Sequence, residues 1–157
     1  MLRKASEADV NGIASVHVQS WLTTYTGIIK AEILAGVSVE NRAKSWLHHV
    51  KDEDQLIYVC EIDGHIVGFT SARQSTALIL TLYILEAYQG EGIGKMLIQT
   101  ILKELASLGH QTATVEVLEA NKSKSFYERM GANLIEKKSV PQYGEGNVLL
   151  TYRWEAM

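Results

Sequence analysis

A short run of glycines is the part of this sequence whose residue types and spacing most directly suggest chemistry. Residues 89–95 read QGEGIGK, with Gly90, Gly92 and Gly94 at alternate positions directly before a helical pattern. Glycine adopts positive φ angles and lets another group approach the backbone closely. The unpaired amides at the start of a helix, together with its positive dipole end, bind anions. The run therefore predicts a site for a phosphate or pyrophosphate; the alternative is a glycine-rich turn without a ligand.

Two common nucleotide-binding motifs do not fit this run. The P-loop requires GxxxxGK[ST], but the interval from Gly90 to Gly94 is one residue too short, and Met96 replaces the Ser or Thr that binds magnesium. The dinucleotide fingerprint requires GxGxxG, whereas residues 90–95 give GxGxGx. The glycine run is therefore not expected to bind a nucleotide in either of these ways.

The cysteine and histidine residues do not indicate covalent or metal chemistry. Cys60 is the one cysteine, and it follows the apolar residues LIYV, where cysteine is usually a small core residue. The sequence has no Gly-x-Ser-x-Gly nucleophile motif. The five histidines form no i, i+4 pair and there is no Cys-x-x-Cys, so no metal is expected. A cysteine without an internal partner favours a reducing compartment, and a cytoplasmic location is expected.

Two neighbouring segments must hold the glycine run in place. Residues 78–85 form a long apolar run with β-branched and aromatic members, which predicts a central, buried strand. Residues 92–108 have apolar side chains at 93, 97, 101 and 105, a spacing typical of a helix packed on a core. Residues 112–118 alternate as a strand does, so the three segments predict a right-handed crossover with a parallel strand pair.

The rest of the pattern predicts an α+β fold with a mixed sheet. Helices are expected from Ser6 to about Gly27 and at residues 31–34, 40–50 and 123–130. Strands are expected at Gln55–Ile62 and His65–Arg73, joined by a tight Asp63-Gly64 turn, and at residues 134–138 and 147–155. The expected order is helices, three strands, a helix, a strand, a helix and two strands.

Size and charge exclude several function classes. A chain of 157 residues with 46% hydrophobic residues can bury one core, so a single domain spanning residues 1–157 is expected. Its 15 basic and 18 acidic side chains give a net charge of −3, and without a basic excess no nucleic-acid partner is expected. No apolar run approaches the length of about 18 residues that spans a bilayer, and the first residues turn polar at once, so neither a membrane segment nor a signal peptide is expected.

Several features around the glycine run occur together in one protein family. Gln89, Gly92 and Gly94 form the pattern Q-x-x-G-x-G, LYIL precedes it at residues 82–85, and VLEANKSKSFYERMG follows at residues 117–131. These residues resemble the GNAT superfamily of acetyl-CoA-dependent N-acetyltransferases, whose signature is [QR]-x-x-G-x-[GA]. Residues 20–29 and 150–154 are similar to one bacterial subgroup of that family.

Two departures from the family pattern accompany the resemblance. Asn121 and Tyr127 are six residues apart, whereas many members have seven. Glu86 stands where a proline is common, and Ala87 where an acid is common.

The resemblance implies a fold and a set of cofactor-binding residues. It implies a mostly antiparallel sheet of about seven strands with four to five helices, and acetyl-CoA in a V between the fourth and fifth strands. The backbone of Leu82, Tyr83 and Ile84 would bond the pantetheine arm. Gln89 would order the loop, and Asn121 would bond the cofactor or, as the alternative, cap a helix. The pyrophosphate would be held by the amides of Gly90, Glu91, Gly92, Ile93, Gly94 and Lys95.

The resemblance also implies a catalytic residue. Tyr127 would be the general acid that protonates the departing thiolate, because a phenol with a pKa near 10 stays protonated at neutral pH. The alternative is an aromatic core residue beside Phe126.

The group that removes a proton from the amine is less defined by the sequence. The candidates are Glu86, Glu119, His17 and an ordered water. Trp21 and Tyr25, with Glu86, are candidates for the acceptor pocket, although the two aromatic residues could instead anchor the first helix on the sheet.

The expected function is direct transfer of acetyl from acetyl-CoA to a primary amine, on a small molecule, an amino acid or a peptide N-terminus. The alternative is a non-catalytic acyl-CoA-binding sensor on the same fold, and the presence of both Asn121 and Tyr127 favours the enzyme. Homodimers are common in the family, so a second copy of the chain is a further possible partner.

Overall fold

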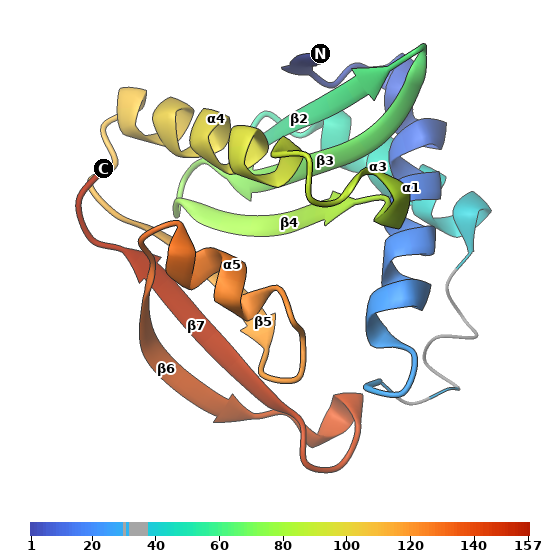
Figure 1. Ribbon diagram of the computed structural model, residues 1–157. Helices are drawn as coiled ribbons and strands as arrows, with labels where there is room; N and C mark the ends of the chain where they lie inside the picture. Colours follow the sequence, from blue (N-terminus) through green and yellow to red (C-terminus); the bar gives the residue numbers. More distant parts are fainter. Residues whose placement is uncertain (30, 32–37) are drawn as a thin grey trace.

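A computed structural model describes residues 1–29, 31 and 38–157 of the chain (Figure 1). In this part of the chain the strands form one seven-stranded sheet with the order β1-β2-β3-β4-β5-β7-β6. The strands are β1 (Leu2–Lys4), β2 (Gln55–Ile62), β3 (His65–Arg73), β4 (Leu78–Ile84), β5 (Ala113–Leu118), β6 (Asn133–Ser139) and β7 (Val148–Trp154). β4 and β5 are parallel and the other neighbours are antiparallel. The expected α+β class and mixed sheet are confirmed.

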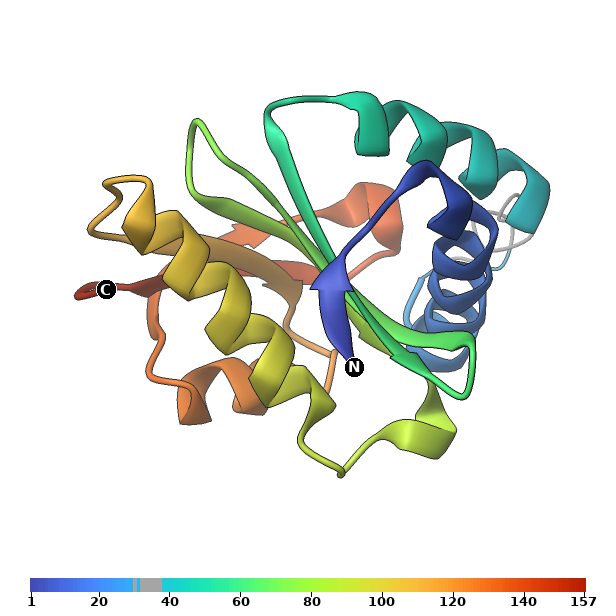
Figure 2. The same cartoon turned by 90° about the horizontal axis from the view of Figure 1, so that it is seen from above.

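Helices cover both faces of the sheet. The described helices are α1 (Val10–Tyr25), α3 (Val39–Lys51), α4 (Ile93–Ser107) and α5 (Lys124–Arg129), with single turns at Glu7–Asp9, Glu86–Tyr88 and Pro141–Tyr143. Figure 2 shows α1 and α3 on one side of the sheet and α4 on the other. The helix expected at residues 31–34 falls, apart from Ala31, outside the described residues. None of the described helices is long and apolar enough to cross a membrane.

Helix α4 and the turn between β2 and β3 form where the local sequence pattern predicts them. In α4, the side chains of Ile93, Leu97, Ile101 and Leu105 are all buried against the sheet, as their spacing predicts. Asp63 and Gly64 both have positive φ, 52° and 80°, which is the geometry of a tight turn between twisted antiparallel strands. The hairpin therefore has the bounds that the sequence predicts.

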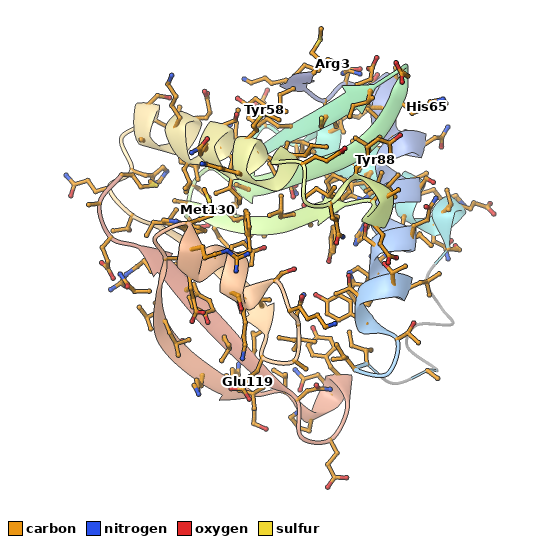
Figure 3. All side chains as sticks on the ribbon, viewed as in Figure 1. Arg3, Tyr58, His65, Tyr88, Glu119 and Met130 are labelled. Carbon is orange, nitrogen blue, oxygen red and sulfur yellow. The ribbon has the colours of Figure 1, made fainter. Side chains whose placement is uncertain are left out.

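Strand β1 was not among the strands predicted from the pattern, because its three residues are too few to show an alternation. Arg3 holds it in place (Figure 3): its guanidinium donates to the Asp9 carboxylate at 2.7 Å and to Glu61 on β2 at 2.6 Å. The hydrogen bonds from Arg3 lower the pKa of Asp9 to about 2. The strand thus depends on contacts with residues distant in sequence.

Strand β4 corrects the expectation of a fully buried strand. Ile79 is buried, but Leu80 is exposed and the remaining residues of the strand are half-buried. A bulge against β3 leaves Leu80 as an extra residue, and β4 pairs with β5 only through Leu78–Thr114 and Ile79–Val115. Beyond Ile79 the two strands separate, so one edge of β4 has no strand partner.

Candidate active site

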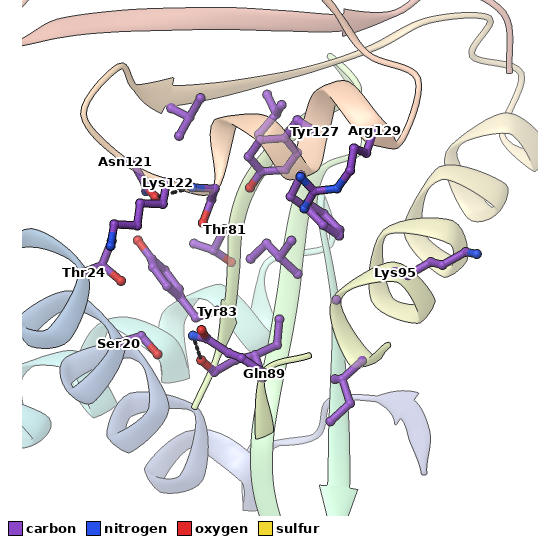
Figure 4. A pocket seen from close by; sticks show the side chains of 18 of the residues that line it. Ser20, Thr24, Thr81, Tyr83, Gln89, Lys95, Asn121, Lys122, Tyr127 and Arg129 are labelled. Atoms are coloured by element: carbon purple, nitrogen blue, oxygen red, sulfur yellow. Dashed lines mark hydrogen bonds between the residues drawn. The ribbon is translucent and has the colours of Figure 1, made fainter. Parts of the chain in front are cut away.

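A cavity of about 490 Å³ opens where β4 and β5 separate (Figure 4). Its walls come from five parts of the chain: α1, β4, the glycine loop with the start of α4, β5, and the segment that begins α5. The residues that matter for the chemistry are Ser20, Thr24, Tyr25, Thr81, Leu82, Tyr83, Ile84, Gln89, Gly90, Gly92, Ile93, Gly94, Lys95, Glu116, Asn121, Lys122, Tyr127 and Arg129.

The glycine loop ends at the start of α4 with unpaired backbone amides. Gly90 and Gly92 have φ of 82° and 84°, and Gly92 is the residue that precedes α4. The first helical hydrogen bond runs from the Met96 amide to the Gly92 carbonyl, so the amides of residues 93–95 have no acceptor within the helix. At Gly94 a Cβ atom would lie 3.2 Å from Ile84 Cδ1, so glycine there allows close packing on β4. This geometry fits an anion.

Of the other loop residues, Gln89 and Lys95 line the cavity and Glu91 does not. Gln89 donates from Nε2 to the Ile84 carbonyl at 3.0 Å, which ties the loop to the end of β4. Glu91 is exposed and does not line the cavity. Lys95 lines the cavity, but its side chain extends away from it in Figure 4. Lys95 therefore contributes to the cavity mainly through its backbone, whereas Glu91 is not part of the lining.

The free edge of β4 offers backbone groups to the cavity. The Leu85 amide donates to the Val67 carbonyl of β3 at 2.9 Å. Because backbone groups alternate in direction along a strand, those of Tyr83 also point toward β3, and those of Leu82 and Ile84 point toward the gap. Since Gln89 already bonds the Ile84 carbonyl, Leu82 is the residue whose amide and carbonyl both remain available there.

Tyr127 has a buried ring and lines the cavity, so its position is compatible with both roles that the sequence left open. Its ring is buried in the core, in edge contact with Phe126 and Trp154. Its hydroxyl points into the cavity in Figure 4 and has no hydrogen-bond partner in the described part of the chain. Burial raises the pKa of Tyr127 well above its ordinary value, and the neighbouring Tyr25 raises it further. The phenol therefore stays protonated at neutral pH.

Asn121 is buried at the edge of the cavity and is committed to protein contacts. Its Nδ2 donates to the Tyr25 hydroxyl at 3.1 Å, and its Oδ1 accepts from the Ser123 amide at 2.8 Å. The second bond shapes the turn before α5, but Asn121 is not the cap of that helix, because the residue in the cap position is Ser123. The first connects that turn to α1.

Trp21 and Tyr25 each connect α1 to a neighbouring segment, although only Tyr25 lines the cavity. Trp21 Nε1 donates to the Tyr83 hydroxyl at 2.6 Å. Burial raises the pKa of both Tyr83 and Tyr25, and each of these neighbouring hydroxyls also acts on the pKa of the other. The Trp21–Tyr83 and Asn121–Tyr25 bonds join α1 to β4 and to the turn after β5, so they fix the cavity wall at α1.

The three side chains proposed from the sequence to accept a proton all lie outside the cavity lining. Glu86 is exposed on its short turn, and Glu119 is paired with Lys137 at 3.4 Å (Figure 3). His17 accepts from Trp46 Nε1 through Nδ1 at 3.0 Å, so the proton of its neutral ring is on Nε2. Burial lowers the pKa of His17 to about 4, which keeps that ring neutral.

Sequence reasoning missed Glu116, which lines the cavity from β5. Among the described lining residues it is the only carboxylate, and it is exposed to solvent. Ala113, Val115 and Val117 are buried toward α4, so the alternation of the strand directs Glu116 to the opposite face. That alternation was visible in the sequence, but which face bordered a cavity was not.

Sequence reasoning also missed Ser20, Thr24 and Lys122, which line the cavity at its α1 end. Taken together, the cavity has an unpaired strand edge, a set of free helix amides and a buried phenol. This combination fits a long molecule that has phosphates at one end, amides along its middle and a reactive group beside Tyr127. Acetyl-CoA has this arrangement.

Comparison with known proteins agrees with this geometry. The family model described as acetyltransferase (GNAT) domain matches residues 29–156. An uncharacterized N-acetyltransferase, YuaI of Bacillus subtilis, is 29% identical over 135 residues, which are 81% of this chain and 76% of that protein. The [ribosomal protein bS18]-alanine N-acetyltransferase of Haemophilus influenzae is 33% identical over 76 residues, 47% of this chain and 52% of that protein.

A solved structure has the same fold. The PaiA N-acetyltransferase of Thermoplasma acidophilum, crystallised with coenzyme A, superposes with a TM-score of 0.82 over 96% of each chain at 23% identity. The fold of this chain is therefore one already known among N-acetyltransferases.

Proposed function

This chain belongs to the acetyltransferase (GNAT) domain family and is an acyltransferase, and we propose that it transfers the acetyl group of acetyl-CoA directly to a primary amine, with residues 1–157 acting as one domain. The observation that carries the proposal is the position of the Tyr127 hydroxyl in the same cavity as the free edge of β4 and the glycine loop. The groups that would bind acetyl-CoA and the group that would donate a proton thus line the same cavity.

The walls of the cavity divide the binding of acetyl-CoA between them. The amides of residues 93–95, with the loop at Gly90 and Gly92, would hold the pyrophosphate, supported by their lack of helical partners. The backbone of Leu82 and the Ile84 amide would bond the amides of the pantetheine arm, as a neighbouring strand would. Gln89 would act indirectly, by fixing the loop to β4.

The chemistry requires one bond to form and one to break. When bound, acetyl-CoA supplies a thioester carbonyl that a neutral amine can attack. The new C–N bond replaces the C–S bond, and the amine nitrogen gives up a proton. Glu116 would take that proton, directly or through water, and pass it to the solvent to which it is exposed.

Tyr127 acts on the leaving sulfur. Its hydroxyl would donate a hydrogen bond, and finally its proton, so that coenzyme A leaves as a thiol and the phenol regains a proton from water. The ordinary pKa of a phenol is already above that of a thiol, and burial raises the pKa of Tyr127 further. Full proton transfer is therefore uphill, and we expect a contribution at the lower end of general acid catalysis.

The acceptor is an amine whose identity the family leaves open. One relative is named for the alanine of a ribosomal protein, which makes a peptide N-terminus one candidate class. Small amines are the other class, and the side chains at the α1 end of the cavity help to choose between the two.

The test is a thiol-release assay with acetyl-CoA and a panel of amines, read together with thermal unfolding. We expect acetyl-CoA and coenzyme A to raise the Tm, because a ligand that binds the native state stabilises it, and to raise it more than NAD does. We also expect one coenzyme A to be released for each acetylated amine, detected by mass spectrometry. A Tm shift without turnover on any amine would indicate a sensor instead, and no shift at all would contradict acetyl-CoA binding.

A further inference from the structure

The α1 end of the cavity contains a buried hydroxyl that no protein group satisfies. Ser20 is 5% exposed, lines the cavity, and its Oγ has no hydrogen-bond partner among the described residues. Buried polar atoms are nearly always hydrogen-bonded, so an exception needs an explanation. An unpartnered hydroxyl in the wall of a binding cavity is explained if a ligand supplies the missing partner.

Neighbouring side chains at this end also present donors. The Tyr25 hydroxyl accepts from Asn121 Nδ2 and donates to no described residue, so its own hydrogen is available to the cavity. Thr24 lines the same end, one helical turn after Ser20. We call Ser20, Thr24, Tyr25 and Lys122 the donor wall.

Lys122 gives the donor wall a positive charge. Its side chain runs toward α1, and its ammonium lies near Thr24 in Figure 4. In the described part of the chain it has no ion-pair partner within 4.0 Å. The other two cations of the cavity, Lys95 and Arg129, come from α4 and α5. Lys122 is therefore separate from the groups that surround the phosphate end.

We propose that the acceptor is a small amine that also carries a carboxylate, and that Ser20, Tyr25 and Lys122 bind this carboxylate. The inference rests on the proposed acetyl transfer and names its substrate class. A carboxylate accepts up to four hydrogen bonds and offers no donor, so it suits a wall of donors. Its bond to a lysine is charge-assisted and stronger than a neutral one.

Other amines fit the donor wall less well. A peptide N-terminus has a neutral carbonyl and a continuing chain in place of the carboxylate. A polyamine would bring a second positive charge toward Lys122. Glu116, on β5, is the carboxylate of the cavity lining and can face the ammonium of the same acceptor.

The experiment compares amino acids with their amides, which differ only in the carboxylate. For α-, β- and γ-amino acids we expect kcat/KM to exceed that of the matching amide at least tenfold, or about 1.4 kcal/mol. Ser20→Ala and Lys122→Met should each reduce this preference several-fold and leave the Kd for acetyl-CoA unchanged. Lys122→Arg should retain most of it.

Two control variants remove a serine hydroxyl and a lysine ammonium outside the cavity lining. Ser15→Ala deletes a hydroxyl of α1 that bonds only Gln19, and Lys124→Met deletes a charge on α5 outside the cavity lining. Both should leave the preference unchanged. Ser20→Ala should not lower the Tm, because it removes a hydroxyl without a partner.

The possible failures are distinct. Equal turnover of acids and amides, preference for polyamines or peptides, or a Ser20→Ala effect on acetyl-CoA affinity alone would overturn the carboxylate proposal and leave acetyl transfer standing. Absence of turnover on every amine would overturn the acetyl-transfer proposal itself.

Discussion

The two ends of the cavity are built from different parts of the polypeptide. The glycine-loop end consists mainly of backbone amides and carbonyls from one continuous segment, residues 89–95, and the adjoining edge of β4. The α1 end consists of side chains from α1, β5 and the turn before α5. A backbone site tolerates many side-chain changes, whereas each substitution at the other end alters what can bind. If the proposed function holds, substitutions should therefore change acceptor recognition more than acetyl-CoA recognition.

Tyr127 lies between the two ends of the cavity, and its substitution should have the largest effect on catalysis. Tyr127→Phe keeps the ring and its contacts with Phe126 and Trp154 and removes the proton donor. We expect kcat to fall about 100-fold, the lower end for general acid catalysis, with little change in Kd for acetyl-CoA. The measurement is steady-state kcat on the best acceptor, with Kd from calorimetry. Turnover within twofold of the wild type, with chemistry limiting the rate, would make Tyr127 a packing residue.

The glycine-loop end is tested by Gly92→Asp, which should be the next largest effect. The new carboxylate would oppose the pyrophosphate, and we expect acetyl-CoA affinity to fall at least tenfold, or about 1.4 kcal/mol. Gly92→Ala separates this charge effect from the strain of a side chain at φ 84°. Gly109→Asp is the distant control, since Gly109 also has positive φ and open space around it. Equal affinity in folded Gly92→Asp and wild-type protein would remove the phosphate role from this loop.

The α1 end is tested by Glu116→Gln, for which we expect a smaller effect. Because Glu116 is exposed, water can replace part of its role, and we expect kcat/KM for the acceptor to fall about fivefold, below the usual range for general base catalysis. The Kd for acetyl-CoA should not change, so the two ends would respond independently. Glu119→Gln, on the outer side and paired with Lys137, is the matched control. An effect of the same size in both variants would indicate a general charge effect.

Much of the fold was predictable because it depends on short-range patterns. The hairpin of β2 and β3 has the expected bounds, since its turn and alternation are local. The exposure of β4 was not predictable, because it follows from a bulge against β3 and from the separation of β5. Likewise β1 forms by pairing with β2, which is distant in sequence, and the bonds of Arg3 to Asp9 and Glu61 support it.

The same distinction holds for the candidate site. The glycine loop was recognisable because its residues are consecutive in the sequence and because positive φ angles at Gly90 and Gly92 favour glycine. Ser20 lies far in sequence from Glu116 and Lys122, and the three residue types are ordinary for a helix, a strand and a turn. Only the folded arrangement brings them to one cavity.

The narrow junction between β4 and β5 divides the sheet into two ladders, each made of one continuous stretch of chain. The first contains β1 to β4 and is followed by the glycine loop, and the second contains β5, β7 and β6 with α5. Such units can open separately below the temperature of global unfolding, and the second, whose β6 is exposed along its length, is expected to open first. Opening would carry Tyr127 and Glu116 away and leave the glycine loop in place. On warming, the protein is therefore expected to lose catalytic activity before it loses the ability to bind the pyrophosphate. Acetyl-CoA, proposed to bind across the junction, would delay both losses.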